Sequence, residues 1–180
     1  IDAAFLGSLV AVLTVDHMGA RVLVKPVDEA GVSAYRGVIF VRPDSPIQRI
    51  EDLAGRSVAM VKTTYAGDLF PIWEMHRTDI NHGATPPRKV WVGTHDDVIS
   101  ETLSGRVEAG AVKNLRLEAY EAAHPDAKLR RLATSPPVPH DAFVVRADLG
   151  EAFAAQIRDV MLAMDKDPEG AKALAGFGAV

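Results

Sequence analysis

The stretch SVAMVKTTYAGDLFPIWEMHR, residues 57–77, decides the fold of this chain. Residues 57–61 form a short apolar run typical of a buried strand, and residues 62–67 carry the hydroxyl groups and the glycine of a loop. A helix is predicted over residues 68–77, and a connection rich in Gly and Pro then leads to a second strand at residues 89–92. Strand, helix and strand in this order indicate a βαβ unit, and hence an α/β fold.

The same alternation extends to both sides of this unit. The next helix is predicted over residues 95–104, because Thr94 can cap its start, Asp97 stands at the third helical position and Gly105 can end it. Further helices are expected at 115–123 and 151–165. Further strands are expected at 21–27, 35–42, 107–112, 129–133 and 142–146. Strands separated by helices in this way predict a largely parallel sheet.

Two proline-rich breaks divide the chain into two α/β lobes. Pro43 and Pro46 flank the first break, and residues 135–139, SPPVP, make the second. We therefore predict a first lobe from residues 1–43 plus 136–180 and a second lobe from residues 44–135. Residues 3–15, the most apolar stretch, are too short to span a bilayer and are expected to be buried lobe structure. Because the chain opens at Ile1 inside this apolar run, we expect an upstream segment to be missing and the first lobe to be incomplete.

Composition and motif content argue against several classes of protein. The 20 basic and 24 acidic residues give a net charge of -4 and are spread without blocks, so no nucleic-acid partner is expected. The absence of cysteine excludes thiolate nucleophiles, cysteine metal sites and disulfides. The sequence contains no Walker loop, no G-x-S-x-G motif and no H-E-x-x-H motif. We therefore expect no catalytic residue, no cofactor and no metal site.

Two loops that follow predicted strands carry candidate anion ligands. Residues 61–67 place the hydroxyl groups of Thr63 and Thr64 before a helix start, where backbone N–H groups and the positive end of the helix dipole favour an anion. His95 stands in the first turn of the following helix, from where its imidazole can donate an N–H to an anion. Asp141 follows the second proline break, where a side chain can reach across a cleft from the other lobe.

Each of these candidates has a plainer alternative. Thr63 or Thr64 can simply cap the helix, since Ser and Thr are favoured at that position. His95 can be a surface histidine, and Asp141 can belong to a turn that enters a strand. Four further histidines are expected to be surface residues, namely His17, His76, His82 and His124.

Short motifs along essentially the whole chain resemble those of the phosphate/phosphonate-type substrate-binding proteins of ABC transporters. In chain order they are AFLG (4–7), YRGVI (35–39), RPDSPI (42–47), IEDLAG (50–55), LFP (69–71), GTHD (93–96), GRVEAGAV (105–112), PHDAFVVRADL (139–149) and MDKDPEG (164–170). The resemblance implies a type II periplasmic-binding-protein fold, in which a cleft between two α/β lobes holds the ligand. It also implies a protein that is periplasmic, or lipid-anchored outside the cytoplasmic membrane, with a membrane permease as its partner.

The resemblance further implies which residues face the ligand. His95 matches the family's ligand-facing histidine, Tyr35 lies near an aromatic residue that lines the cleft, and Asp141 is similar in place to a residue of the opposite wall. Family members commonly carry Ser-Thr-Ser-Gly in the first loop, whereas this chain has Thr64-Tyr65-Ala66-Gly67. Tyr65 therefore favours a different or smaller ligand than a typical phosphonate.

The expected function is binding of a phosphonate, phosphite or phosphate-like oxyanion for delivery to an ABC importer, with no chemistry done on the ligand. Two alternatives stay open. The same lobes can form the sensory domain of a signalling receptor, or an enzyme can be built on this fold, because a fold alone does not fix function.

Overall fold

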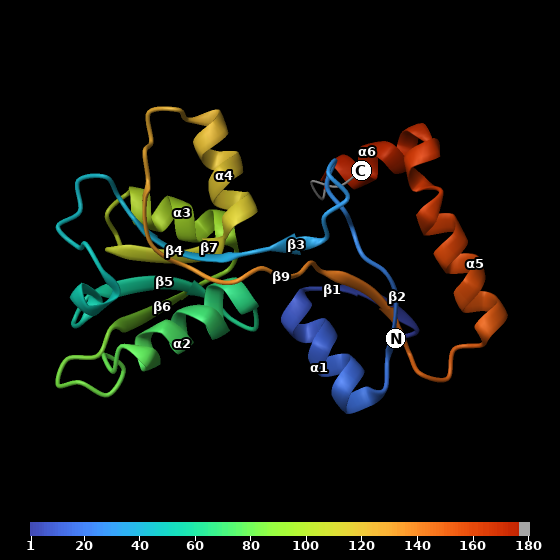
Figure 1. The fold of residues 1–180 in the computed structure, drawn as a ribbon, viewed down its shortest axis with the longest axis horizontal. Helices are drawn as coiled ribbons and strands as arrows, with labels where there is room; N and C mark the ends of the chain where they lie inside the picture. Colours follow the sequence, from blue (N-terminus) through green and yellow to red (C-terminus); the bar gives the residue numbers. More distant parts are fainter. Residues whose placement is uncertain (177–180) are drawn as a thin grey trace. The chain divides into compact units, whose positions relative to one another are not determined.

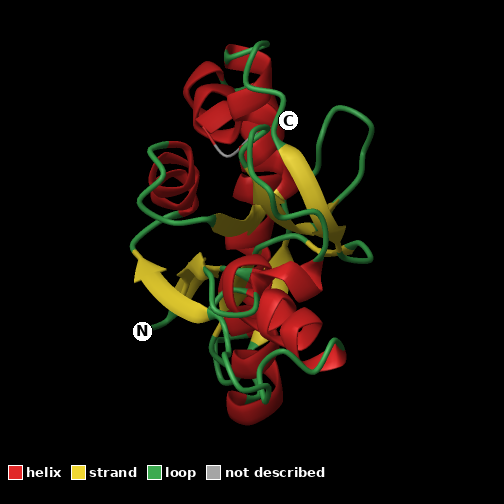
Figure 2. Cartoon of the chain, turned by 90° about the vertical axis from the view of Figure 1, so that its left-hand side faces the viewer, coloured by secondary structure: helices red, strands yellow, loops and turns green. Residues whose placement is uncertain are grey.

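Two units share the chain. Unit 1 contains residues 1–34 together with the chain from residue 138 on, and unit 2 contains Tyr35–Pro137. The computed structural model describes residues 1–176. Both units combine helices with strands (Figure 2), so the expected α/β class is confirmed.

Unit 2 is built on a five-stranded sheet with the strand order β6-β5-β7-β4-β8. Its strands are β4 (Gly37–Val41), β5 (Ser57–Val61), β6 (Arg88–Val92), β7 (Ala109–Lys113) and β8 (Arg130–Thr134). β5 runs parallel to β6 and to β7, but β4 is antiparallel to both β7 and β8. The prediction of a largely parallel sheet is therefore wrong for β4. Antiparallel strands need no crossover helix, and the connection from β4 to β5 carries only the 3-10 turn η1 (Ile50–Leu53).

Helices cover both faces of this sheet (Figure 1). One face packs against α2 (Phe70–Arg77) and η1, with Phe70 and Met75 buried against Ile39 and Met60. The other face packs against α3 (His95–Leu103) and α4 (Asn114–Ala123), with Val98 and Leu117 buried beside Phe40. Neighbouring residues of β4 thus enter opposite core clusters, as the two-residue period of a strand requires.

The helix predicted over residues 68–77 begins earlier than expected. Its first turn is η2 (Tyr65–Leu69), a segment of π-helix that continues directly into α2. Such turns are rare and have no periodic sequence pattern of their own. The start of α3 agrees with the prediction, since Thr94 caps the helix and Asp97 completes a capping box.

Unit 1 contains a three-stranded sheet with the order β1-β10-β2, in which β10 is antiparallel to both neighbours. Its strands are β1 (Ala3–Leu6), β2 (Arg21–Val24) and β10 (Ala142–Val145). Its helical segments are α1 (Ser8–Met18), α5 (Glu151–Leu162), η3 (Met164–Lys166) and α6 (Pro168–Gly176).

The apolar run at residues 3–15 is only partly the buried structure that its composition predicts, since Ala11 is buried but several apolar neighbours are exposed. The strand β1 ends at Leu6 and the helix α1 begins two residues later, after Gly7. Val12 is 61% exposed and Leu13 is 42% exposed. Because apolar residues occur all around α1, the sequence does not indicate which face is covered.

Two short strands mark the places where the chain passes between the units. The first passage lies in β3 (Ala34–Tyr35), and the return lies directly before β9 (Val138–Pro139), which pairs with β3. The predicted lobes assign residues 35–43 to the first lobe. In the structure these residues belong to unit 2, because β4 is hydrogen-bonded between β7 and β8.

Candidate functional site

One edge of the unit 2 sheet gathers most of the candidate ligands. β5 and β6 are parallel neighbours that pair as far as Val61 and Val92, so the loops that follow them leave the sheet at the same edge. β7 also ends there, and its last residue, Lys113, is opposite Gly37 at the start of β4. We call this the carboxyl edge, because it is formed by the C-terminal ends of β5, β6 and β7. In an α/β sheet this is the edge at which ligands bind.

The Thr64 hydroxyl holds the loop after β5 in place. Its Oγ1 accepts a hydrogen bond from the Gly67 N–H at 3.0 Å and donates one to the Val61 carbonyl at 2.9 Å. Thr64 is therefore the N-cap of the helical segment, which is the alternative that the sequence left open. A hydroxyl has a single proton, and here the Val61 carbonyl accepts it. In this geometry Thr64 therefore shapes the loop and does not donate a side-chain hydrogen bond to a ligand.

Thr63 is held in an unusual backbone conformation by a carboxylate. Its φ angle is 61°, in the left-handed region that a β-branched residue rarely adopts. The Thr63 N–H donates to Oδ2 of Asp68 at 2.9 Å, which ties the loop to the first helical turn. The role of Asp68 was not predicted, because its only signal in the sequence is that of an acidic residue in the first turn of a helix.

Two glycines allow this loop to approach the sheet closely. A Cβ atom on Gly67 would lie 2.8 Å from Oγ1 of Thr64 and 3.0 Å from the Val61 backbone nitrogen. A Cβ atom on Gly37 would lie 2.7 Å from Cδ1 of Phe70. The contacts at 2.8 Å and 2.7 Å are shorter than real Cβ atoms show, so the loop can take this position only because Gly67 and Gly37 lack a side chain.

Tyr65 is part of a row of aromatic rings. Its ring centroid lies 6.3 Å from that of Tyr35, nearly edge-on, and 6.3 Å from that of Phe70, in a stacked arrangement. Tyr35 is buried and Tyr65 is half-buried against the core under α2. The Lys113 ammonium lies 4.5 Å from the centre of the Tyr35 ring, which brings a positive charge to the carboxyl edge. Lys113 is a further candidate, and its sequence signal is its place at the end of a buried strand.

His95 is the first residue of α3 and is half-buried. Oγ1 of Thr94 accepts from the Asp97 N–H at 3.1 Å, and Oδ2 of Asp97 accepts from the Thr94 N–H at 2.8 Å. These reciprocal bonds fix the start of the helix and with it the backbone of His95. The structure thus brings His95, Thr63, Thr64, Tyr65 and Tyr35 to one edge of one sheet.

Asp141 lies in unit 1, at the start of α1. Its Oδ1 accepts a hydrogen bond from the Ser8 N–H at 3.2 Å, so the carboxylate faces the positive end of the helix dipole. The Asp141 N–H donates to Nδ1 of His140 at 2.8 Å, and this requires the neighbouring imidazole to carry its proton on Nε2 when neutral. Asp141 directly precedes β10, in agreement with the alternative of a turn that enters a strand, and its carboxylate also holds the start of α1. No sequence pattern indicates the hydrogen bond between Asp141 and Ser8.

Neither a metal cluster nor a membrane span emerges from the part of the chain that the structure describes. Within residues 1–176, three or more metal-ligating side chains do not gather at any point. The helices in the same range are also too short or too polar to cross a membrane.

Comparisons with known proteins agree with this architecture. A crystal structure of the binding-protein component of an ABC phosphonate transporter from Pseudomonas aeruginosa superposes with a TM-score of 0.82 at 20% identity, over 99% of this chain and 62% of that one. A structure of PhnD1 from Prochlorococcus marinus in complex with methylphosphonate gives a TM-score of 0.79 at 21% identity, over 99% of this chain and 71% of that one. These similarities show the type II periplasmic-binding-protein fold, as expected.

A curated relative is the phosphonates-binding periplasmic protein of Escherichia coli strain K12. It is 25% identical over 94% of this chain, and the chain spans about half of its length, 52%. The model of the family described as "ABC transporter, phosphonate, periplasmic substrate-binding protein" matches residues 1–180. The chain therefore belongs to the family of periplasmic substrate-binding proteins of phosphonate ABC transporters.

Proposed function

We propose that this chain is part of the substrate-binding component of an ABC importer and binds a phosphonate, phosphite or phosphate-like oxyanion. The observation that carries the proposal is the carboxyl edge of unit 2, where two helix starts, His95 and Lys113 occur at the end of three parallel strands. A relative with the same fold is bound to methylphosphonate. Family membership also supports a periplasmic location and a membrane permease as partner.

In this proposal the ligand is held by donors of different kinds. The backbone N–H groups at the start of η2 face the oxyanion, and Thr63 and Thr64 fix the loop that presents them. The His95 imidazole donates a hydrogen bond, and Lys113 adds positive charge. Binding by charge-assisted hydrogen bonds requires no cofactor and no turnover of the ligand.

Asp141 and the two tyrosines set the selectivity in this proposal. A carboxylate can accept a hydrogen bond only from a protonated oxyanion, so Asp141 favours ligands that carry a proton at neutral pH. Tyr65 packs against Phe70 and meets Tyr35 edge-on, so its ring acts as a rigid apolar wall. This ring stands where relatives commonly carry a small hydroxyl residue. It therefore favours a compact ligand over a ligand with a long substituent.

The test is a calorimetric titration of the full chain with phosphite, phosphate, methylphosphonate, aminoethylphosphonate and sulfate. We expect a phosphorus oxyanion to bind, and at one hundred times its dissociation constant to stabilise the fold by about 2.7 kcal/mol. His95→Ala is expected to weaken binding at least tenfold. His124→Ala serves as the control, since that exposed ring stacks on Tyr120 at the end of α4. Equal affinity in the wild type and the His95 variant would remove His95 from the site, and heat exchange with none of the anions would contradict the function.

A further inference from the structure

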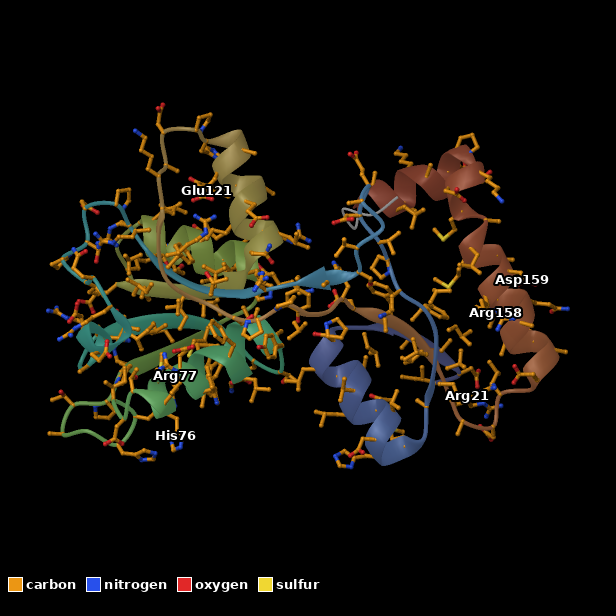
Figure 3. All side chains as sticks on the ribbon, viewed as in Figure 1. Arg21, His76, Arg77, Glu121, Arg158 and Asp159 are labelled. Carbon is orange, nitrogen blue, oxygen red and sulfur yellow. The ribbon has the colours of Figure 1, made fainter. Side chains whose placement is uncertain are left out.

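Two histidines that the anion site does not use lie together at the far end of α2. Nδ1 of His76 lies 3.2 Å from Nε2 of His82, and the two ring planes are nearly perpendicular, at 83°. Both side chains are exposed. Figure 3 shows His76 beside Arg77 at the end of α2 in unit 2.

The turn between the two histidines is fixed by the fold. The Asp79 N–H donates to the His76 carbonyl at 2.9 Å, and Asp79 adopts a left-handed φ of 61°. Ile80 is buried in the core under α2, and the Asn81 N–H donates to the Met75 carbonyl at 3.3 Å. The backbone on both sides of the pair is therefore anchored, and the turn brings the two imidazoles within hydrogen-bonding distance of each other.

We propose that His76 and His82 form a two-histidine binding site for a divalent transition-metal ion. The metal takes the place of the proton that one ring donates to the other, and the donating ring then carries its proton on its other nitrogen. A metal bonded to each nitrogen at about 2.0–2.1 Å would subtend an angle of about 100° across the 3.2 Å separation, close to the tetrahedral value. Imidazole nitrogen is a preferred ligand of Cu²⁺, Ni²⁺ and Zn²⁺. Water completes the coordination shell, because the described residues contain no cluster of three ligating side chains.

The guanidinium of Arg77, the residue after His76, does not oppose a bound metal strongly. Nη2 of Arg77 donates to Oε2 of Glu74 at 2.7 Å, so its charge is compensated by a buried carboxylate. The Arg77 guanidinium also lies 5.6 Å from the Trp73 ring, which is exposed. Trp73 precedes His76 by one helical turn, so its fluorescence reports on a metal at the pair.

The metal site is separate from the proposed anion site. The helical segment that starts at Tyr65 and ends at Arg77 has the Thr64 loop at its first end and the His76 pair at its last. His76 follows Tyr65 by eleven positions along this helical segment, or about 16 Å at the α-helical rise of 1.5 Å per residue. Loss of either site is therefore expected to leave the other intact.

The experiment titrates the full chain, without an affinity tag, with Cu²⁺, Ni²⁺ and Zn²⁺, following heat and tryptophan fluorescence. We expect one ion per chain, with Cu²⁺ bound most tightly and quenching the fluorescence. His76→Gln and His82→Gln keep a hydrogen-bonding side chain, and each is expected to weaken Cu²⁺ binding at least tenfold. His17→Gln, at an exposed position of α1, is the matched control and is expected to bind as the wild type does.

A second measurement guards against a folding defect. Far-ultraviolet circular dichroism and phosphite titration of both variants are expected to match the wild type. Equal Cu²⁺ affinity in the wild type and both variants would overturn the proposal, as would a wild-type chain that binds none of the three metals.

Discussion

The backbone of Thr63 shows how a single residue can carry strain at a binding loop. A non-glycine residue in the left-handed region costs on the order of 1–2 kcal/mol. The hydrogen bond from the Thr63 N–H to Asp68 offsets part of this cost and fixes the loop directly before the Thr64 cap. We infer that Asp68 is a positioning residue for the proposed anion site.

Asp68→Ala is therefore expected to lower the free energy of unfolding by about 1 kcal/mol and to weaken oxyanion binding several-fold. In a chain that also carries Thr63→Gly, Asp68→Ala is expected to lower the free energy of unfolding by a smaller amount, because glycine adopts a φ of 61° without steric strain. Urea denaturation of the four proteins of this double-mutant cycle measures the difference. Strictly additive losses would contradict the coupling between Thr63 and Asp68.

For individual residues, the sequence was sufficient to predict roles that follow simple helix-capping rules. It was not sufficient to predict roles that depend on the geometry of a turn. Thr94 and Asp97 were predicted as cap and third helical residue, and both do this in the structure. Asp68 and Lys113 were not identified, because their contacts depend on where a loop or strand ends in space. The ligand roles of Tyr35, Thr63, Thr64, Tyr65, His95 and Asp141 stay predictions.

Among the secondary-structure elements, β5 and β7 are joined by a carboxylate at their starting ends. Glu108, directly before β7, accepts a hydrogen bond from the Ser57 N–H at 2.8 Å and one from Nη1 of Arg56 at 2.9 Å. Partial burial is the largest single influence and acts to raise the pKa of Glu108. The hydrogen bonds from Ser57 and Arg56 together outweigh it, so the pKa of Glu108 is held below its ordinary value.

A carboxyl whose pKa is lowered by folding stabilises the protein above its unfolded pKa and loses this contribution as the pH falls. We therefore expect the Glu108 contribution to be present at neutral pH and to disappear as the pH drops below about 4.5. Glu108→Gln should destabilise the chain at pH 7 and differ less from the wild type at pH 3.5. Thermal unfolding over this pH range provides the measurement, with Glu29→Gln in an exposed turn as control. An effect of Glu108→Gln that is independent of pH would contradict this account.

The order of helices and strands followed from the sequence, but the direction of β4 did not. An apolar strand that is buried on both faces has the same composition whether its neighbours are parallel or antiparallel. The π-helical turn η2 was missed for a similar reason, since such a turn is rare and has no periodic sequence pattern of its own.

Over the whole molecule, the two units differ in the size of the side chains that they bury. Unit 2 fully buries large residues such as Phe40, Phe70 and Met60, each worth about 1.5–3 kcal/mol in transfer from water. The buried members of the two core clusters in unit 1 are mostly smaller, namely Ala11, Ala142 and Val144 in one and Val145, Leu149 and Ala154 in the other.

We therefore predict that a fragment of residues 35–137 folds on its own and unfolds cooperatively in urea. In the full chain, amide hydrogens of β5 and β7 are expected to exchange with deuterium more slowly than those of β1, β2 and β10. Mass spectrometry of the exchanging chain tests this order. A fragment without a cooperative transition, or equal exchange in both sheets, would contradict it.

Motifs spread over the whole chain were sufficient to predict the family and the fold, because they cover elements of both units. The exposure of α1 could not be predicted, since a helix that is apolar on every side gives no indication of which residues meet solvent.

The ends of unit 2 are neighbours, because Val38 pairs with Thr134 and the Ser135 N–H donates to the Gly37 carbonyl at 2.9 Å. A segment with adjoining ends can be cut from one protein and spliced into a surface loop of another without stretching either backbone. Unit 2 is in this sense a transferable cassette. It could be inserted between the two halves of a fluorescent reporter protein. By circular permutation, its own ends could also be joined and new termini created at another position.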